Sequence, residues 1–231
     1  SVPNARVNEI KAAAQSASGN TVTVDRILAT GGRYDLAAAI ARRIKQVHGT
    51  PPVVLVANGA DPAKFFDALA LSPIAASQGY PVLLVSADRV PPATSAVIAE
   101  FGSPRVIVGG GPNTVTEAVR KSVGATAQDR WYGQNRYSTA TTIAQKAVGE
   151  YFCTYQWVGV AAKLPDALTG GSAVGYRGGV LVITDGTTLS SPTAAFLEAH
   201  DVDIRICLIF GGENSLSEGV RAAIDQKLLL P

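Results

Sequence analysis

The chain contains two copies of one ordered series of short motifs, and this internal repeat limits what it can fold into. Each copy has an Arg-Tyr pair, an Asp-Ala-Leu triplet, an apolar segment and a Gly-Gly turn. These motifs are Arg33-Tyr34, Asp67-Ala68-Leu69, Val82–Val85 and Gly110-Gly111 in the first copy, and Arg136-Tyr137, Asp166-Ala167-Leu168, Val180–Ile183 and Gly211-Gly212 in the second. A repeat of about 100 residues is too long for a solenoid unit and long enough for a small domain.

Short runs of Val and Ile alternate with Ala-rich segments along each copy. The runs at 53–57, 81–85 and 105–108 lack polar alternation, which is typical of strands buried on both faces of a parallel sheet. The segments between them have helical spacing. The pattern predicts an α/β fold of tandem Rossmann- or flavodoxin-like modules, each with a mostly parallel sheet sandwiched by helices. In flavodoxin-like order the first and third core strands are neighbours. A further strand is expected to open each copy, at 22–27 and at 127–131.

The Gly-Gly turns are followed by segments that resemble helix starts. Thr114 with Glu117, and Ser215 with Glu218, match the capping box, in which a hydroxyl and a carboxylate each pair with an unpaired amide. The first residues of the chain align with these segments. We therefore expect residues 1–20 to form the last helix of an earlier repeat, and residues 21–124 and 125–231 to form two complete repeats.

The bulk chemistry of the chain excludes several classes of function. Its formal net charge is only +2, without any Lys/Arg run, so nucleic-acid binding is not predicted. No apolar run approaches the roughly 20 residues of a membrane span. The glycine turn at 109–112 lacks the spacing of a dinucleotide fingerprint and the lysine of a phosphate loop. With two histidines and no cluster of ligand spacing, no catalytic residue, metal site or cofactor is predicted.

The polar residues that both copies keep are the candidate binding residues. Asp67 and Asp166 each begin a helix after a core strand, where an acid either caps the helix and complements its dipole or contacts a ligand at the carboxyl ends of the strands. The Arg-Tyr pairs either support the fold or contact an acidic sugar or phosphodiester, with a bidentate charge beside a stacking face. The candidates are Arg33, Tyr34, Asp67, Arg136, Tyr137 and Asp166.

The two cysteines, Cys153 and Cys207, both fall in the second copy. They are either two buried free thiols or a disulfide, and a disulfide would indicate an oxidising, extracellular setting. Flavodoxin-like order would place them at the same end of adjacent strands, where a bridge is feasible.

Taken together, the motif series resembles the putative cell wall binding repeat type 2 family. The motifs that carry the resemblance are Arg26-Ile27, Arg33-Tyr34, Asp67-Ala68-Leu69 and Gly110-Gly111, with Arg130-Trp131, Arg136-Tyr137, Asp166-Ala167-Leu168 and Gly211-Gly212 in the second copy. The resemblance covers almost the whole chain. It implies a non-catalytic, extracellular anchor of a bacterial surface or secreted protein, built of Rossmann-type modules around a pseudo-threefold axis. The implied partners are an anionic cell-wall polysaccharide or teichoic-type polymer and other repeats of the same or neighbouring chains.

Two other functions stay open from the residues alone. A self-assembling structural surface module predicts oligomers without any polymer. A flavodoxin-like enzyme or small-ligand receptor predicts one dominant pocket at the carboxyl ends of the strands.

Overall fold

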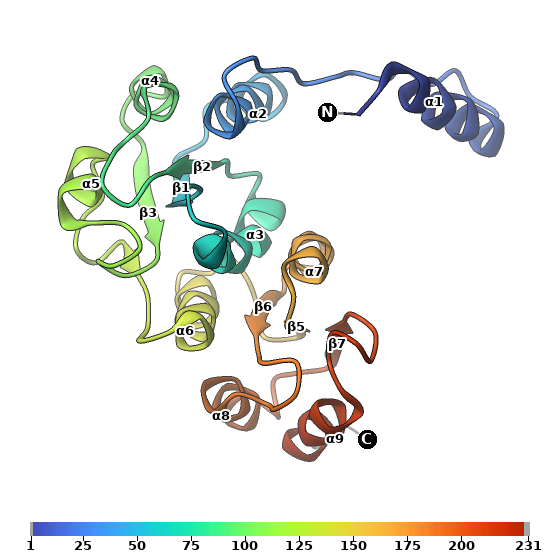
Figure 1. The fold of residues 1–231 in the computed structure, drawn as a ribbon, viewed down its shortest axis with the longest axis vertical. Coiled ribbons are helices and arrows are strands. Elements are labelled where there is room, and N and C mark those ends of the chain that lie inside the picture. The colour runs from blue at the N-terminus through green and yellow to red at the C-terminus, as the bar shows by residue number, and fades with distance from the viewer. Residues whose placement is uncertain (1, 229–231) are drawn as a thin grey trace.

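The computed structural model describes residues 2–228 and contains two α/β units in sequence (Figure 1). The sheet of the first unit has the order β2-β1-β3-β4, and all its pairs are parallel. The sheet of the second unit has the order β6-β5-β7, also parallel. The first and third core strands are neighbours in both sheets, as the sequence predicts. The strands are β1 (Val53–Asn58), β2 (Val82–Val85), β3 (Arg105–Gly109), β4 (Arg130–Trp131), β5 (Trp157–Ala161), β6 (Val180–Ile183) and β7 (Ile206–Phe210).

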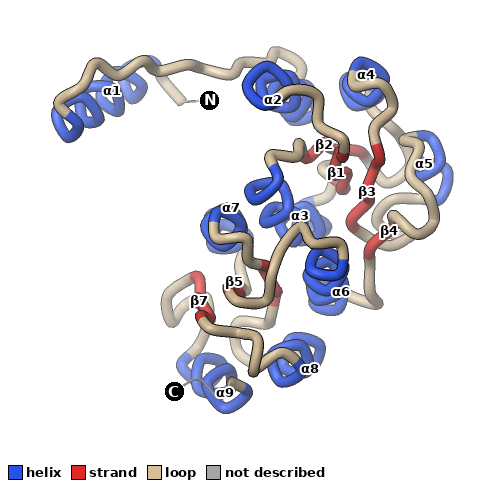
Figure 2. The backbone as a smooth tube through the Cα atoms, turned by 180° about the vertical axis from the view of Figure 1, so that it is seen from behind, coloured by secondary structure: helices blue, strands red, loops and turns tan. Residues whose placement is uncertain are grey.

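Helices surround both sheets, which confirms the predicted α/β class (Figure 2). The central strands are rich in buried Val, Leu, Ile and Ala because helices exclude water from both of their faces. Apart from the short helix η1 (Pro62–Lys64), which has no counterpart among the described residues of the second unit, each unit uses equivalent helices in equivalent places. They are α2 (Arg33–His48), α3 (Phe65–Gln78), α4 (Pro92–Glu100) and α5 (Glu117–Ser122) in the first unit, and α6 (Arg136–Gly149), α7 (Leu164–Tyr176), α8 (Ser191–Ala199) and α9 (Glu218–Lys227) in the second.

The prediction of a strand at 22–27 is wrong, because residues 21–29 form no strand. Its counterpart β4 does form, but β4 pairs with β3 of the first unit, Val108 with Arg130 and Gly109 with Trp131. This edge strand therefore completes the sheet of the unit before it. Residues 21–29 pair with no strand among the described residues.

The helix starts after the Gly-Gly turns also differ from the prediction. The expected caps were Thr114 and Ser215, but the observed caps are Thr116 and Ser217, whose side chains accept hydrogen bonds from the amides of Val119 and Val220. Residues 112–115 form a turn that precedes α5, so the helix begins two residues later than the capping-box spacing indicates.

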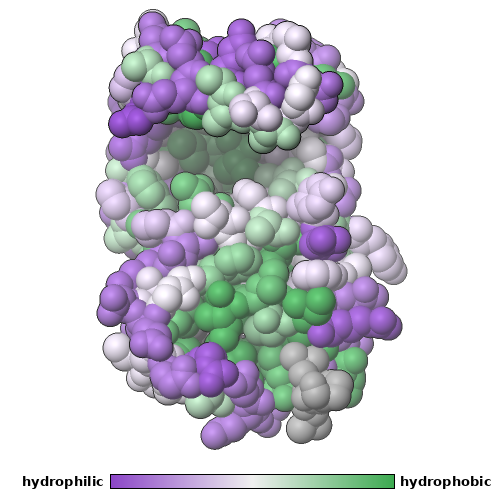
Figure 3. Space-filling view, turned by 90° about the vertical axis from the view of Figure 1, so that its right-hand side faces the viewer, coloured by the Kyte–Doolittle hydropathy of each residue, from purple (hydrophilic) through white to green (hydrophobic). Residues whose placement is uncertain are grey.

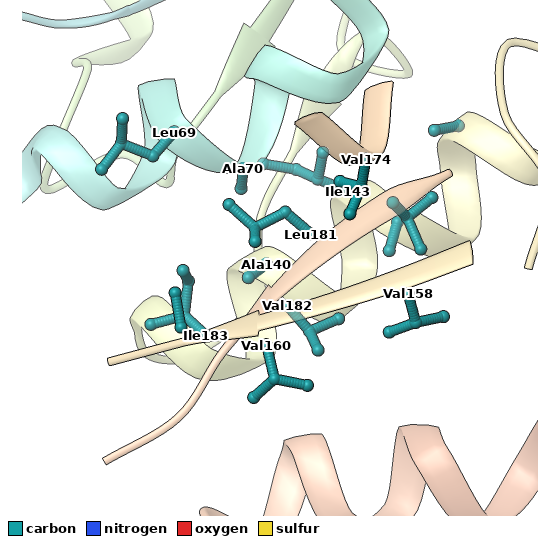
Figure 4. Packing of buried hydrophobic residues seen from close by; sticks show 14 of the residues in the cluster. Leu69, Ala70, Ala140, Ile143, Val158, Val160, Val174, Leu181, Val182 and Ile183 are labelled. Atoms are coloured by element: carbon teal, nitrogen blue, oxygen red, sulfur yellow. The ribbon is translucent and has the colours of Figure 1, made fainter. Parts of the chain in front are cut away.

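The two units meet along α3 and α7, which form the most extensive contact between two helices. Gly171 and Gly175 of α7 face α3. A Cβ atom built on Gly175 would lie 2.6 Å from the carbonyl oxygen of Pro73 and 2.8 Å from Cβ of Ala76. The absence of side chains at these two positions lets the helices approach closely. One hydrophobic cluster crosses the junction, with Leu69 and Ala70 of α3 near Val174, Ile143 and Leu181 (Figure 4).

Helix α1 (Asn4–Ser18) lies apart from both units, at the end of a long connection (Figures 1 and 2). None of its residues is buried. Among residues 2–228, no helix combines the length and the hydropathy that crossing a membrane requires.

Candidate functional site

A hollow of about 500 Å³ lies at the carboxyl ends of the strands of the first sheet, where the first unit meets the second. The first unit contributes η1, the start of α3 and the turn after β3. The loop after β4 and the start of α6 form the other side. Its lining residues are Ala63, Lys64, Asp67, Gly111, Pro112, Asn113, Thr114, Tyr132, Gly133, Gln134, Asn135, Arg136 and Thr139. We call this hollow the junction pocket.

Asp67 lies at the base of the junction pocket, in the first turn of α3. It is only 6% exposed, and no described group donates a hydrogen bond to its carboxylate. Burial raises the pKa of Asp67 to about 6, opposed by the positive charge of Lys64. The carboxylate lies against Gly110, whose φ is +110° and on which a Cβ would meet Oδ2 at 2.5 Å. Gly110 is therefore required both for its backbone conformation and for its lack of a side chain.

Asp67 does not cap its helix. The residue at the N-cap of α3 is Lys64, and no side chain makes a capping hydrogen bond there. Asp67 does stand in the first turn of α3, where an acid complements the helix dipole, so this part of the structural alternative stays open. A buried carboxyl group with no described donor is also free to bond a ligand in the pocket.

Arg136 approaches the pocket from the second unit. Its helix is well started, since Asn135 and Ser138 form a capping box at the N-terminus of α6. The Arg136 guanidinium lies 5.0 Å from the ring centroid of Phe66 and 5.1 Å from that of Tyr137, and its Nη2 donates to the Tyr137 hydroxyl at 3.2 Å. Stacking on the two rings holds an exposed charge at the rim of the pocket.

The structure brings together some of the predicted site residues and separates others. Asp67 and Arg136 line the same pocket, with Tyr137 beside Arg136. Arg33 instead donates to the carbonyl oxygen of Gly59 at 2.6 Å and lies over the ring of Phe65 in its own unit. Tyr34 is half-buried at the start of α2.

Asp166 has the same local setting as Asp67 but not the same pocket. Its Oδ2 is buried without a hydrogen-bond partner among the described residues and lies against Gly211, whose φ is +115°. No later repeat provides a counterpart of Arg136 at this end of the second sheet in the part of the chain that the structure describes.

Sequence reasoning did not find Lys64, Asn113 and Tyr132, which also line the pocket. Tyr132 packs its ring against Gly111, where a Cβ would lie 2.8 Å from the ring. Tyr132 directly follows the edge strand β4, which the sequence predicts to open the second repeat but which pairs with β3 of the first unit. Asn113 and Lys64 lie in a turn and a short insertion without any recognisable motif.

The two cysteines are free thiols, so the second of the two sequence-based alternatives, the disulfide, is not formed. They lie against different helices. Cys153 contacts the hydroxyl of Ser77 on α3 at 3.8 Å, and burial raises its pKa to about 11. Cys207 pairs with Val158 in the sheet; burial, with the charge of Asp225 on α9, raises its pKa to about 12. Residues 2–228 contain no group of three or more His, Cys, Asp or Glu side chains that could hold a metal ion.

Comparisons with known proteins agree with this architecture. The model of the family described as Cell wall binding domain 2 matches residues 28–120 and 130–221. The chain is 29% identical over 170 residues to the N-acetylmuramoyl-L-alanine amidase LytC of Bacillus subtilis, and 31% identical over 137 residues to the amidase enhancer of the same organism. These matches cover 74% and 58% of this chain, but only 32% and 18% of the relatives.

Two solved structures have the same fold. Cwp6 from Clostridium difficile superposes with a TM-score of 0.71 at 21% identity, over 91% of this chain and 34% of that chain. Cwp8 from the same organism superposes with a TM-score of 0.72 at 19% identity, over 96% of this chain and 36% of that chain. The chain therefore spans about a third or less of the length of the proteins it matches. With two copies of the family model over most of its length, the chain belongs to the Cell wall binding domain 2 family and is a cell-wall-binding module of the bacterial surface.

Proposed function

We propose that the module is a non-catalytic anchor that holds a larger surface or secreted protein on an anionic cell-wall polymer, and that the junction pocket contacts this polymer. The observation that carries the proposal is that Asp67 of one repeat and Arg136 of the next line the same pocket. This combination exists only where two successive repeats meet.

The chemistry of the pocket suits an acidic carbohydrate. Arg136 and Lys64 offer charges that attract a phosphate or carboxylate group of the polymer. Tyr132 is 45% exposed and offers an aromatic face to a sugar ring. The Asp67 carboxyl group can bond a sugar hydroxyl, because no described protein group donates a hydrogen bond to it.

The same residues support a binding role over catalysis. Asp67 is the only acidic residue that lines the junction pocket, and none of the described lining residues is a histidine or a cysteine. A glycosidase uses a pair of carboxyl groups across one cleft, which this pocket does not provide. Incubation with isolated cell wall should release no new reducing ends or amines, and steady release of either would contradict the non-catalytic proposal.

Arg136→Ala tests the role of the pocket. Retention on immobilised, purified cell-wall polysaccharide should weaken by about tenfold, because a charge-assisted contact contributes roughly 1.5–3 kcal/mol. Arg177→Ala is the matched control, since Arg177 also lies over an aromatic ring, 5.1 Å from the centroid of Trp157, but away from the pocket. Equal loss in both variants, or no loss in Arg136→Ala, would remove the pocket from the binding surface.

The salt dependence of retention tests the charge of the polymer separately. Binding of the unaltered module should weaken as the salt concentration rises, because salt screens exposed charges. Retention that is indifferent to salt would contradict an anionic ligand, even if Arg136 matters for another reason.

A further inference from the structure

Helix α6 ends at a tyrosine in a backbone conformation that favours glycine. Tyr151 has a φ of +61°, and Ser103 is the only other described residue besides glycine with a positive φ. The amide of Tyr151 donates to the carbonyl oxygen of Val148 at 3.0 Å, a hydrogen bond typical of a helix end with a left-handed residue, where glycine is preferred. A glycine with a positive φ ends five other helices, and these residues are Gly19, Gly79, Gly102, Gly124 and Gly178.

The fold does not depend on the side chain of Tyr151. The residue is 93% exposed, so its ring adds little to the packing of the second unit. A bulky residue is strained in left-handed backbone, whereas glycine adopts it freely. Residues held in strained backbone cluster at functional sites, so the exposed ring is a candidate contact for a ligand.

Two hollows flank Tyr151 at the amino ends of the strands of the second sheet. One, of about 450 Å³, lies between the ends of α3 and α7, and the other, of about 510 Å³, lies between the loops that precede β5 and β7. Tyr151, Cys153 and Thr154 line both of them. Each volume falls within the roughly 300–1,000 Å³ of small-ligand sites. We call Tyr151 and the two hollows the Tyr151 surface.

Contact between successive units leaves this end of the sheets open. Tyr151 belongs to a unit that follows another: the carbonyl oxygen of Phe152 accepts a hydrogen bond from the Ser77 hydroxyl of α3 at 3.0 Å, yet the Tyr151 ring stays exposed. In the first unit, which has a unit after it, the corresponding loop residues at 49–50 and 102–103 are exposed as well. The exposure of the Tyr151 surface is therefore a property of the repeat contact itself.

A broad hydrophobic area covers much of the lower half of Figure 3, on the side where Figure 1 places α7, β7 and α9. Nothing among the described residues shows what covers that area. The Tyr151 surface is more informative, because exposed polar side chains surround its ring and indicate the chemistry of a ligand.

The polar side chains around Tyr151 suit an uncharged sugar. Thr154 and Gln156 are exposed and can each donate and accept hydrogen bonds, as sugar hydroxyl groups do. The two charged residues that line the second hollow, Asp203 and Arg205, have opposite signs, so this hollow offers no excess charge to an anion. The Tyr151 ring offers an apolar face on which the C–H groups of a sugar ring can stack.

We propose that the Tyr151 surface binds an uncharged sugar unit of a cell-wall glycan, which stacks on the Tyr151 ring and bonds to Thr154 and Gln156. The junction pocket lies at the carboxyl ends of the strands and suits an anionic group, whereas this surface lies at the amino ends and suits a neutral one. The two surfaces share no lining residue, so each proposal stands without the other. A module with both contacts holds its polymer at two points, which raises the overall affinity.

Two substitutions at Tyr151 separate the role of its ring from that of its backbone. Tyr151→Gly removes the ring and relieves the left-handed strain, so the midpoint of thermal unfolding should be at least as high as that of the unaltered chain. Tyr151→Phe keeps the ring and the strain, and is the matched control. A lower midpoint for Tyr151→Gly would show that the ring supports the fold and would overturn the proposal.

Saturation-transfer NMR then measures the binding of two uncharged probes, maltotriose and tri-N-acetylchitotriose. At least one probe should bind the unaltered chain and Tyr151→Phe alike, and should bind Tyr151→Gly about tenfold more weakly. Binding should be the same at low and at high salt, and in Arg136→Ala, because the junction pocket takes no part in it. Failure of both probes to bind, or equal binding to Tyr151→Gly, would overturn the proposal. The anionic-polymer proposal fails in a different assay, retention on charged polysaccharide, so the two outcomes are distinguishable.

Discussion

The close approach of α3 and α7 predicts that adding one methyl group to α7 will destabilise the protein. In Gly175→Ala the new Cβ would lie 2.6 Å from the carbonyl oxygen of Pro73 and 2.7 Å from its Cα. Optimal contact between such atoms is about 3.5–4.0 Å, so the two helices must separate by roughly 1 Å. The colliding atoms belong to backbone, which cannot move aside as the end of a side chain can.

Two opposing terms set the size of this effect. Overpacking of a well-packed contact typically costs about 1–3 kcal/mol. Alanine is favoured over glycine inside a helix by about 1 kcal/mol, which acts in the other direction. We therefore expect a net loss of roughly 1–2 kcal/mol in the free energy of unfolding, which lowers the midpoint by about 2–4 °C per kcal/mol in a chain of this size.

Urea unfolding followed by tryptophan fluorescence measures this loss; of the two tryptophans, Trp131 is buried in the cluster that crosses the junction. Gly219→Ala in α9 is the control, because a Cβ there would meet only the Ser217 hydroxyl, at 3.8 Å. The control should be neutral or slightly more stable than the unaltered chain. If Gly175→Ala is stabilised as much as Gly219→Ala, the tight helix contact is refuted.

Three other predictions concern charge and the thiols. The raised pKa of Asp67, about 6 against 3.8 in the unfolded chain, means that its contribution to stability is fully present below about pH 4 and is lost as the pH rises through 6. Asp67→Asn should remove this pH-dependent loss of stability, which amounts to at most about 3 kcal/mol. Unfolding curves of the unaltered chain and of Asp67→Asn at pH 4 and pH 7 measure it. If the difference in the free energy of unfolding between the two proteins is the same at both pH values, Asp67 does not titrate in this way. Arg105→Ala should lower the free energy of unfolding by about 1–3 kcal/mol, because Arg105 pairs with Glu150 and with Asp129, whose side chain is only 9% exposed. The control is Arg6→Ala, at an exposed position. Equal stability of the two variants would contradict the role of these ion pairs. Thiol titration in denaturant without reductant should find two thiols per chain, and a count of zero would show that the disulfide forms. In the folded protein both thiols should react slowly with an alkylating reagent, because burial raises their pKa.

The sequence was sufficient for the core of each unit. Continuous runs of Val and Ile identify strands such as Val53–Asn58, because burial on both faces leaves no polar alternation. The observed order of the core strands agrees with the flavodoxin-like order that the prediction assumed for this alternation of strands and helices. The division into residues 1–20, 21–124 and 125–231 stays a prediction.

The edge strand and the pocket were harder to predict from the sequence, for one physical reason. Both depend on which repeat lies beside which, and hydrophobic periodicity reports burial without naming the partner. Trp131 reads as the start of the second repeat, yet its strand pairs with β3 of the first. Asp67 and Arg136 were both found as candidates, but their meeting in one pocket follows only from that pairing. The left-handed backbone at Gly110 that receives Asp67 carries no signal beyond the glycine itself.

The offset between the sequence repeat and the folded unit has a practical consequence for anyone who wishes to cut this protein. A fragment that stops at residue 124, where the motif series ends, would lack β4 and the Arg130 contacts that fasten the turn after β3. Extending the same fragment to residue 133 would return both. Excision sites in proteins of this kind should therefore be chosen by strand pairing, a few residues beyond the limit that alignment of the copies suggests.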